Sequence, residues 1–343
     1  MKNKNISQQL LDTFNESPLC ILSLSSKELF HSNMLSLLFR KFPTFLNDFC
    51  GCKVTAPAKI TREEKNIDIM VKTSSMTFFI ENKVKSIPDK DQLEKNMTKH
   101  NGHFILLTLI PPTFNPQKMT KKLRVVTYAE LSTMISKIST NDPYLKNLIK
   151  DYLDLLTVLE EIKTAVMANS RTETLFLDKT IQAQLAGIRM EDVGQKIRFS
   201  SSLRFFQTDC AGLYCDDIST DLYCDDISAG LSHTKGLLSL KTTIGNYKIG
   251  IQIQEGVYRR FVESTNKTSV RKIAEELRRK NIWFEGDFTS NKFNKFAEIF
   301  LYTKVQVPTH TIDQLCKHAR EDGEYLKKNR GKIEKILLRM QET

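Results

Sequence analysis

Three charged residues, Asp68, Glu81 and Lys83, have the types and spacing needed to hold a divalent metal ion beside an amine. Residues i and i+2 of a strand share a face, so Glu81 and Lys83 are expected on one side of the strand-like segment FFIENKV. The thirteen positions from Asp68 to Glu81 suit a strand, a tight turn and a returning strand. Two converging carboxylates favour Mg²⁺ or Mn²⁺, and a nearby lysine can orient or deprotonate a water or stabilise charge on a phosphate.

These charges interrupt a segment that is otherwise apolar. Charged groups that enter a buried sheet cost free energy unless they have partners, which favours a site with a purpose. The simpler alternative is an ordinary Glu–Lys pair at the end of a strand.

The surrounding segments predict the elements that would position these residues. Helical spacing of apolar residues covers 26–42 and stops at Pro43, and the run HFILLTLI at 103–110 suits a buried central strand. The order of elements predicts an α/β layer with a mixed sheet flanked by helices. The remaining expected elements are two or three strands within 51–85, a helix from Pro88 to about His100, a short strand at 124–127 and a helix at 128–138.

The ordered motifs resemble those of the PD-(D/E)XK nuclease superfamily over roughly residues 20–135. The matching elements are Glu28-Leu29-Phe30-His31-Ser32, Ile67-Asp68, Glu81-Asn82-Lys83 and Gln92. They look closest to a subgroup with a Glu-x-x-His-Ser helix, an IENK strand and a downstream glutamine. Ile67 replaces the usual proline, and Asn96 and Lys99 stand where an aromatic residue often follows the glutamine.

The resemblance implies a restriction-endonuclease-like core and a role for each matching residue. Asp68 and Glu81, with the main-chain carbonyl of Asn82, would bind Mg²⁺ or Mn²⁺, and Lys83 would position the attacking water. Glu28 would complete the metal shell or a second site, and Gln92 would contact the phosphate or orient Lys83. His31, Ser32 and Lys99 are candidate nucleic-acid contacts, although a structural histidine is an equal alternative for His31. Such proteins often act in bacterial and phage conflict, so antiviral defence is an associated expectation.

The rest of the chain predicts a trailing helical region at 142–187 and then an α+β region. Strands are expected at SLRFFQ (202–207) and in a hairpin of GLLSLKTTI and YKIGIQIQ around Gly245-Asn246. Helices are expected at 269–280 and 311–341. We place the domain boundary at 190, giving 1–190 and 191–343. The segment LYCDDIS occurs twice, at 213–219 and 222–228, and is interpreted as an acidic surface hairpin.

Charge and composition indicate a polyanionic partner. The net charge is +11, and it is divided as +6 in 1–170, −4 in 171–230 and +9 in 231–343. The basic helix contributes Arg271, Arg278, Arg279 and Lys280 as candidate nucleic-acid contacts. Seven scattered cysteines without a CxxC pair, and the lack of a long apolar run, predict a cytoplasmic protein with free thiols and no membrane partner.

We therefore expect a metal-dependent hydrolase that cleaves phosphodiester bonds, most plausibly of DNA. An RNA nuclease, or a non-catalytic binding module that retains the nuclease fold, are the alternatives that the sequence leaves open. The C-terminal region would contact substrate, pair two copies of the chain as a homodimer, or bind a partner protein of a defence system.

Overall fold

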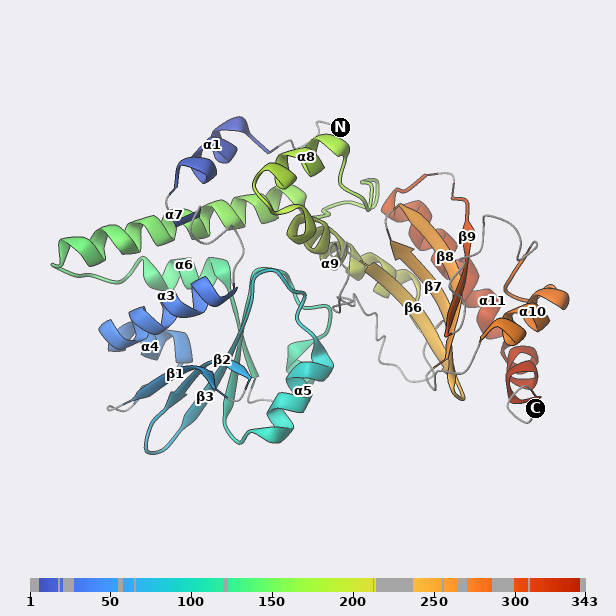
Figure 1. Cartoon of the computed structure of the whole chain (residues 1–343), viewed down its shortest axis with the longest axis horizontal. Coiled ribbons are helices and arrows are strands. Elements are labelled where there is room, and N and C mark those ends of the chain that lie inside the picture. Colours follow the sequence, from blue (N-terminus) through green and yellow to red (C-terminus); the bar gives the residue numbers. More distant parts are fainter. Residues whose placement is uncertain are drawn as a thin grey trace. The chain divides into compact units, whose positions relative to one another are not determined.

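A five-stranded mixed sheet forms where the sequence is rich in apolar residues between positions 59 and 127 (Figure 1). Its strands follow chain order: the first three are antiparallel, and the last two run parallel to the third. The mixed sheet is the one that the sequence predicts. Its strands are β1 (Lys59–Glu64), β2 (Ile67–Lys72), β3 (Thr77–Lys83), β4 (His103–Thr108) and β5 (Leu123–Thr127).

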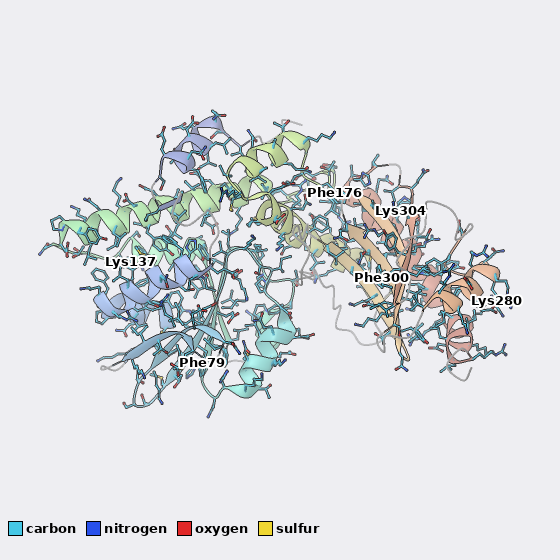
Figure 2. The ribbon with its side chains drawn as sticks, in the orientation of Figure 1. Phe79, Lys137, Phe176, Lys280, Phe300 and Lys304 are labelled. Atoms are coloured by element: carbon cyan, nitrogen blue, oxygen red, sulfur yellow. The ribbon has the colours of Figure 1, made fainter. Side chains whose placement is uncertain are left out.

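Helices cover both faces of this sheet. Helix α3 packs against β1, β2 and β3 on one face. On the other face, Met97 of α5 packs against a core cluster that includes Phe104 and Phe79. Figure 2 labels Phe79. The helices of this part are α1 (Gln8–Glu16), α3 (Glu28–Lys41), α4 (Pro43–Cys50), α5 (Lys90–Lys99), α6 (Tyr128–Ile135), α7 (Pro143–Val166) and α8 (Lys179–Gly187), with a 3₁₀ turn at Pro116–Lys118.

The computed structural model of the chain divides into two units. The first contains residues 1–167 and 177–200, and the second contains 168–176 and 201–343. The expected boundary at 190 differs because α9 (Glu191–Asp209) crosses the division, so that its first ten residues belong to the first unit. The residues described are 6–17, 19–20, 28–54, 58–64, 66–119, 123–211, 213, 237–254, 256–264, 270–285, 299–307 and 309–339.

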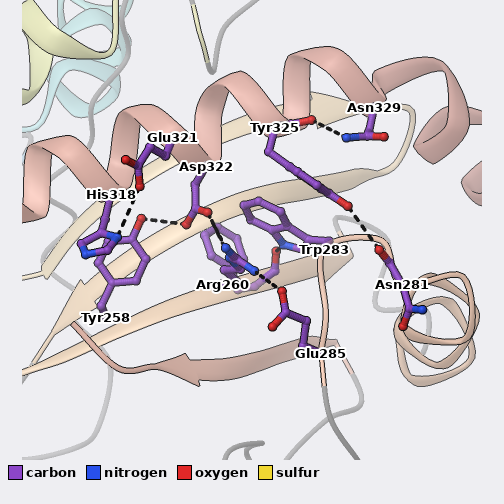
Figure 3. A network of polar contacts seen from close by, with 11 residues as sticks. Tyr258, Arg260, Asn281, Trp283, Glu285, His318, Glu321, Asp322, Tyr325 and Asn329 are labelled. Carbon is purple, nitrogen blue, oxygen red and sulfur yellow. Dashed lines mark hydrogen bonds and ion pairs between the residues drawn. The ribbon is translucent and has the colours of Figure 1, made fainter. Parts of the chain in front are cut away.

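The second unit is built on a four-stranded antiparallel sheet in chain order. The helix α11 packs against β6 and β7. Asp322 of α11 accepts hydrogen bonds from Tyr258 and Arg260 of β8, and the Arg260 guanidinium lies over the ring of Trp283 (Figure 3). The elements are β6 (Leu237–Ile244), β7 (Tyr247–Gln254), β8 (Val257–Ser264), α10 (Arg271–Arg279), β9 (Phe300–Val305) and α11 (Ile312–Arg339).

Several sequence expectations are confirmed. The hairpin around Gly245-Asn246 forms, with Ile244 paired to Tyr247 and Gly245 at a positive φ of 58°, a conformation that glycine adopts without strain. The segment expected at 311–341 forms a single helix, α11. Most of the LYCDDIS repeat lies outside the described residues.

Two expectations about the middle of the chain are wrong. The segment SLRFFQ belongs to helix α9 rather than to a strand, because its adjacent phenylalanines are compatible with a strand or with a partly buried helix. The helical region at 142–187 is interrupted between Val166 and Lys179. In this interruption the Ser170 hydroxyl accepts a hydrogen bond from the Thr172 N–H, and the Asp178 side chain caps the next helix.

The helices and cysteines bear on the environment of the chain. Among the described helices, none combines the length and apolar character needed to cross a bilayer. The five described cysteines, Cys20, Cys50, Cys52, Cys210 and Cys316, are free thiols, as expected. Cys215 and Cys224 lie outside the described residues.

Candidate active site

The hairpin formed by β2 and β3 brings Asp68 opposite Glu81. Ile69 pairs with Ile80, so the next step of the same register places Asp68 across from Glu81. The backbone N–H of Asn82 donates a hydrogen bond of 2.7 Å to Asp68 Oδ2. Asp68 is the second residue of β2 and Glu81 lies near the last residue of β3, because in an antiparallel hairpin the start of one strand meets the end of the other.

Glu81, Lys83 and Gln92 meet on the face of the sheet that α5 covers. The Lys83 ammonium lies 2.8 Å from Glu81 Oε1, and the Gln92 amide donates to the same oxygen at 3.3 Å. Strand alternation explains the shared face of Glu81 and Lys83, and helix α5 brings Gln92 to it. Four of the predicted site residues therefore come together: Asp68, Glu81, Lys83 and Gln92.

The side chain of Asn82 points to the opposite face and fixes the end of β3. Its amide nitrogen donates to the Glu28 carbonyl at 3.0 Å and to Ser32 Oγ at 3.3 Å. Its amide oxygen accepts a hydrogen bond of 2.8 Å from the Tyr128 hydroxyl. Helices α3 and α6 thus hold the strand from one side, while its charged residues face the other side.

The two carboxylates of the hairpin are crowded and incompletely paired. Burial raises the pKa of Asp68 from 3.8 to about 7, repulsion by Glu81 adds to the rise, and the Asn82 N–H and Lys83 oppose it. Glu81 is 6% exposed, and its Oε2 atom is buried without a hydrogen-bond partner among the described residues. A buried anionic oxygen in this state is costly unless something positive binds it.

The lysine beside this pair is held as a cation. Burial by itself lowers the pKa of Lys83, but the charge of Glu81 and the hydrogen bond to it outweigh this, with smaller contributions from Glu28 and Asp68. The net result is a raised pKa, which keeps the ammonium charged at neutral pH. In this state Lys83 can orient a water or an anion, but it has no free site for a proton.

The donor set fits a small divalent cation. Among the described residues, no group of three or more His, Cys, Asp or Glu side chains is placed to hold a metal ion. The side-chain oxygens that lie together here are those of Asp68 and Glu81. Carboxylate and carbonyl oxygens are the ligands that Mg²⁺ and Mn²⁺ prefer, and Mg²⁺ usually keeps several waters.

Glu28 lies beside this group but is engaged differently. Its Oε1 atom accepts hydrogen bonds from the N–H groups of Val84, Lys85 and Ser86 at 3.2, 3.2 and 3.3 Å. The carboxylate of Glu28 also contributes to the raised pKa of Asp68, so the two lie within electrostatic range. The described contacts of its carboxylate are with the turn after β3.

The candidate nucleic-acid contacts on α3 are buried. His31 and Ser32 are 0% and 1% exposed, so neither presents a surface to a polyanion. The His31 Nδ1 atom lies 3.0 Å from the Tyr152 hydroxyl, and burial lowers the pKa of His31 from 6.5 to about 3. Burial leaves neither side chain on a surface that a phosphate could reach, and the surroundings of His31 fit the structural alternative. Lys99 is exposed at the end of α5.

The basic residues of α10 are largely paired within their own helix. Arg271 pairs with Glu275 at 3.2 Å, and Arg279 and Lys280 pair with Glu276 at 2.8 and 3.5 Å. Arg278 is half-buried rather than exposed. The patch predicted from the sequence is therefore partly neutralised by glutamates one turn away.

Two side chains near the site could not be identified from the sequence. The Tyr128 hydroxyl holds Asn82, and Lys196 of α9 donates a hydrogen bond of 3.3 Å to the Lys85 carbonyl. Neither belongs to a local motif, because each reaches the site from a separate helix. Strand alternation predicts that the Asn82 side chain points to the face opposite Glu81 and Lys83, but not which residues it bonds there.

Comparisons of the chain with protein-family models, with curated proteins and with solved structures gave no match. The geometry of the described residues is therefore the basis for a functional conclusion.

Proposed function

We propose that the first unit is a divalent-metal-dependent nuclease with a restriction-endonuclease-like core, and that its substrate is DNA. The observation that carries the proposal is the buried Oε2 atom of Glu81. This oxygen has no hydrogen-bond partner among the described residues and belongs to a carboxylate opposite Asp68. A cation between the two carboxylates would relieve both their repulsion and the missing contact.

The donors for this ion would be Asp68, Glu81 and the Asn82 carbonyl. When bound, a divalent ion supplies an activated water for attack on phosphorus and stabilises negative charge on the phosphate.

The protein itself positions the reacting groups. The Asn82 N–H fixes the orientation of the Asp68 carboxylate, and the Gln92 amide and Lys83 ammonium fix that of Glu81. The Lys83 ammonium would orient the attacking water or stabilise charge that develops on the phosphate oxygens. Since Lys83 is already paired with Glu81, binding of a metal at Glu81 would leave the ammonium available to substrate.

A nucleic-acid substrate fits the charge of the chain. The net charge of +11 favours association with a polyanion, and residues 1–170, which contain the site residues, contribute +6. The resemblance of the ordered motifs to PD-(D/E)XK nucleases supports DNA as the first substrate to test. The experiment below also tests the two alternatives, an RNA nuclease and a non-catalytic binding module.

The test incubates the full chain with duplex DNA, single-stranded DNA and RNA, in Mg²⁺, in Mn²⁺ and in EDTA. Lys83→Ala and Glu81→Ala are compared with Lys72→Ala and Glu94→Ala, two exposed residues of the same unit. Removal of a group that stabilises a transition state costs on the order of 10²–10³-fold in rate. We expect losses of this size for the two site variants and none for the controls.

Each outcome decides between the alternatives. Metal-dependent cleavage of DNA that both site variants abolish supports the proposal. Cleavage of RNA alone would retain the chemistry and change the substrate. Binding without cleavage in every metal, or cleavage that Lys83→Ala and Glu81→Ala leave intact, would refute the nuclease assignment.

A further inference from the structure

The turn that follows β3 donates its backbone N–H groups to the carboxylate of Glu28. Three successive backbone N–H groups, those of residues 84, 85 and 86, converge on the Glu28 Oε1 atom. Convergent N–H groups of this kind form an anion-binding concavity. Here the anion is a carboxylate of helix α3, so the protein fills this concavity with its own side chain.

Lys196 holds the same turn by donating a hydrogen bond to one of its carbonyls. Lys196 of α9 is 3% exposed, and its ammonium donates to the Lys85 carbonyl at 3.3 Å. A buried ammonium requires hydrogen-bond acceptors, because its transfer from water is otherwise costly. Helix α9 also reaches the loop after β4, where the Ser200 hydroxyl donates to the Pro111 carbonyl at 2.6 Å. The turn is therefore fixed from α3 on one side and from α9 on the other.

Glu28 connects this turn to the strand that precedes it. Its backbone carbonyl accepts the Asn82 amide, while its carboxylate binds the turn that begins one residue after Lys83. Lys83 thus lies between two segments that the same helical residue holds in place. The Lys83 carbonyl also accepts a hydrogen bond of 3.0 Å from the Leu109 N–H, which ties the backbone of Lys83 to the residue after β4.

We propose that Glu28 and Lys196 are positioning residues that clamp the turn at 84–86 and so fix Lys83 relative to Glu81. The carboxylate of Glu28 serves the turn rather than the metal, which agrees with the lack of a group of three acidic or imidazole side chains among the described residues. The clamp itself is a property of the fold, and its effect on cleavage rests on the proposed nuclease function.

Amide hydrogen exchange, measured by mass spectrometry on the full chain in EDTA, tests the clamp without any activity. We expect Glu28→Ala and Lys196→Met to speed exchange at 84–86 by at least about tenfold, because local opening loses its opposing hydrogen bonds. Glu28→Gln keeps an acceptor oxygen and should remain within about threefold of the unmodified chain. Glu94→Ala, an exposed helical glutamate, is the matched control and should leave exchange at 84–86 unchanged.

Metal titration then separates a positioning residue from a ligand. With Glu28→Ala we expect kcat to fall about 10–100-fold, as for other supporting residues, with the metal concentration for half-maximal rate unchanged and Glu28→Gln restoring most of the rate. Direct Mn²⁺ binding should likewise be unchanged in both variants.

Two results would overturn the proposal. One is unchanged exchange at 84–86 in both Glu28→Ala and Lys196→Met. The other is weakened Mn²⁺ binding in Glu28→Gln, which would make Glu28 a ligand. If the unmodified chain cleaves no nucleic acid, the nuclease function fails while the exchange result still decides the clamp.

Discussion

Among the described residues, each unit buries one carboxylate almost completely, and the two have opposite hydrogen-bonding environments. Asp322 is 5% exposed, and both of its oxygens are bonded: Oδ2 by the Tyr258 hydroxyl at 2.8 Å, and Oδ1 by Arg260 at 2.7 and 3.1 Å (Figure 3). Glu81 is 6% exposed, and one of its oxygens has no hydrogen-bond partner among the described residues. The two carboxylates are therefore similarly buried, but the oxygens of Asp322 are fully hydrogen-bonded and those of Glu81 are not.

Under the proposed function, the difference separates a structural charge from a reactive one. Asp322 is bound by Arg260, whose other carboxylate contact is the exposed Glu285 at 3.5 Å, whereas Glu81 is close enough to Asp68 to raise the pKa of Asp68. A buried charge that is fully hydrogen-bonded fixes packing, and one that is left incomplete stores an affinity for a ligand. Removing Asp322 should therefore destabilise the second unit, whereas removing Glu81 should cost the first unit its affinity for a cation.

The largest expected effect is the loss of stability on removing Asp322. Asp322→Ala removes the acceptor of the buried Tyr258 hydroxyl and the main partner of the half-buried Arg260, which keeps only its contact with the exposed Glu285. We expect a loss of about 3 kcal/mol, the lower end of the range for breaking a buried pair. The chain has a single tryptophan, Trp283, whose ring lies beside Arg260, so its fluorescence during urea unfolding reports this unit selectively. Glu81→Gln should leave that transition unchanged, and an unaltered midpoint in Asp322→Ala would contradict the comparison.

The next effect is a pH dependence in which two groups of the first unit, the half-buried Asp68 and the buried His31, oppose each other. With a pKa raised from 3.8 to about 7, Asp68 holds a proton in the folded chain that the unfolded chain releases, so its contribution to stability falls as the pH rises through this range. With a pKa lowered from 6.5 to about 3, His31 does the reverse, and its contribution falls as the pH drops through that range. The two contributions cancel where the ranges overlap.

Single variants should separate the two contributions to the pH dependence of the free energy of unfolding. Relative to the unmodified chain, Asp68→Asn should gain stability by about 1.4 kcal/mol for each pH unit between about 4 and 7, a total of at most about 4 kcal/mol. His31→Gln should show the opposite sign between about 3 and 6.5. Urea unfolding in EDTA, followed by circular dichroism, measures both. Parallel pH profiles for all three chains would show that these groups do not titrate as their surroundings indicate.

A smaller effect is expected from metal binding in the absence of substrate. An ion at 100 times its dissociation constant stabilises the folded state by about 2.7 kcal/mol. Mn²⁺ should therefore raise the thermal unfolding temperature of the first unit, and Glu81→Gln should abolish the rise. The transition reported by Trp283 serves as the internal control. An equal rise in Glu81→Gln would place the ion elsewhere.

The sequence predicts relations within one element better than those between elements. Strand spacing placed Glu81 and Lys83 on one face, and the interval to Asp68 predicted the hairpin, because both depend on local geometry alone. The target of the Glu28 carboxylate could not be predicted, since it lies 56–58 positions away in a turn whose position depends on packing. His31 shows the same limit: helical spacing put it beside Glu28, but only the packing of Tyr128 and Tyr152 around it shows that it is buried.

The C-terminal region shows why some elements were missed altogether. The hairpin of β6 and β7 has a turn signal at Gly245-Asn246, whereas β9 follows a stretch without a comparable signal and pairs with β8 only through tertiary contacts. The strand predicted at SLRFFQ failed for a related reason. Two adjacent phenylalanines are compatible with a strand or with a buried helix, and the neighbours that decide between them are remote in sequence.

The smallest expected effect concerns α10, where the glutamates pair with the basic residues. One phosphate contact changes the slope of log K against log salt by about 0.9 for duplex DNA. Arg279 donates two hydrogen bonds to Glu276, so Arg279→Ala should change the slope of DNA binding by less than a full contact. Glu276→Gln frees both Arg279 and Lys280 from their shared partner and should steepen the slope instead. Binding titrations from low to moderate salt, with Lys72→Ala as the control, measure both changes. The expectation fails if Arg279→Ala reduces the slope by a full contact and Glu276→Gln does not steepen it. The basic residues of α10 would then leave their glutamates to bind phosphates, and α10 would be part of the DNA-binding surface.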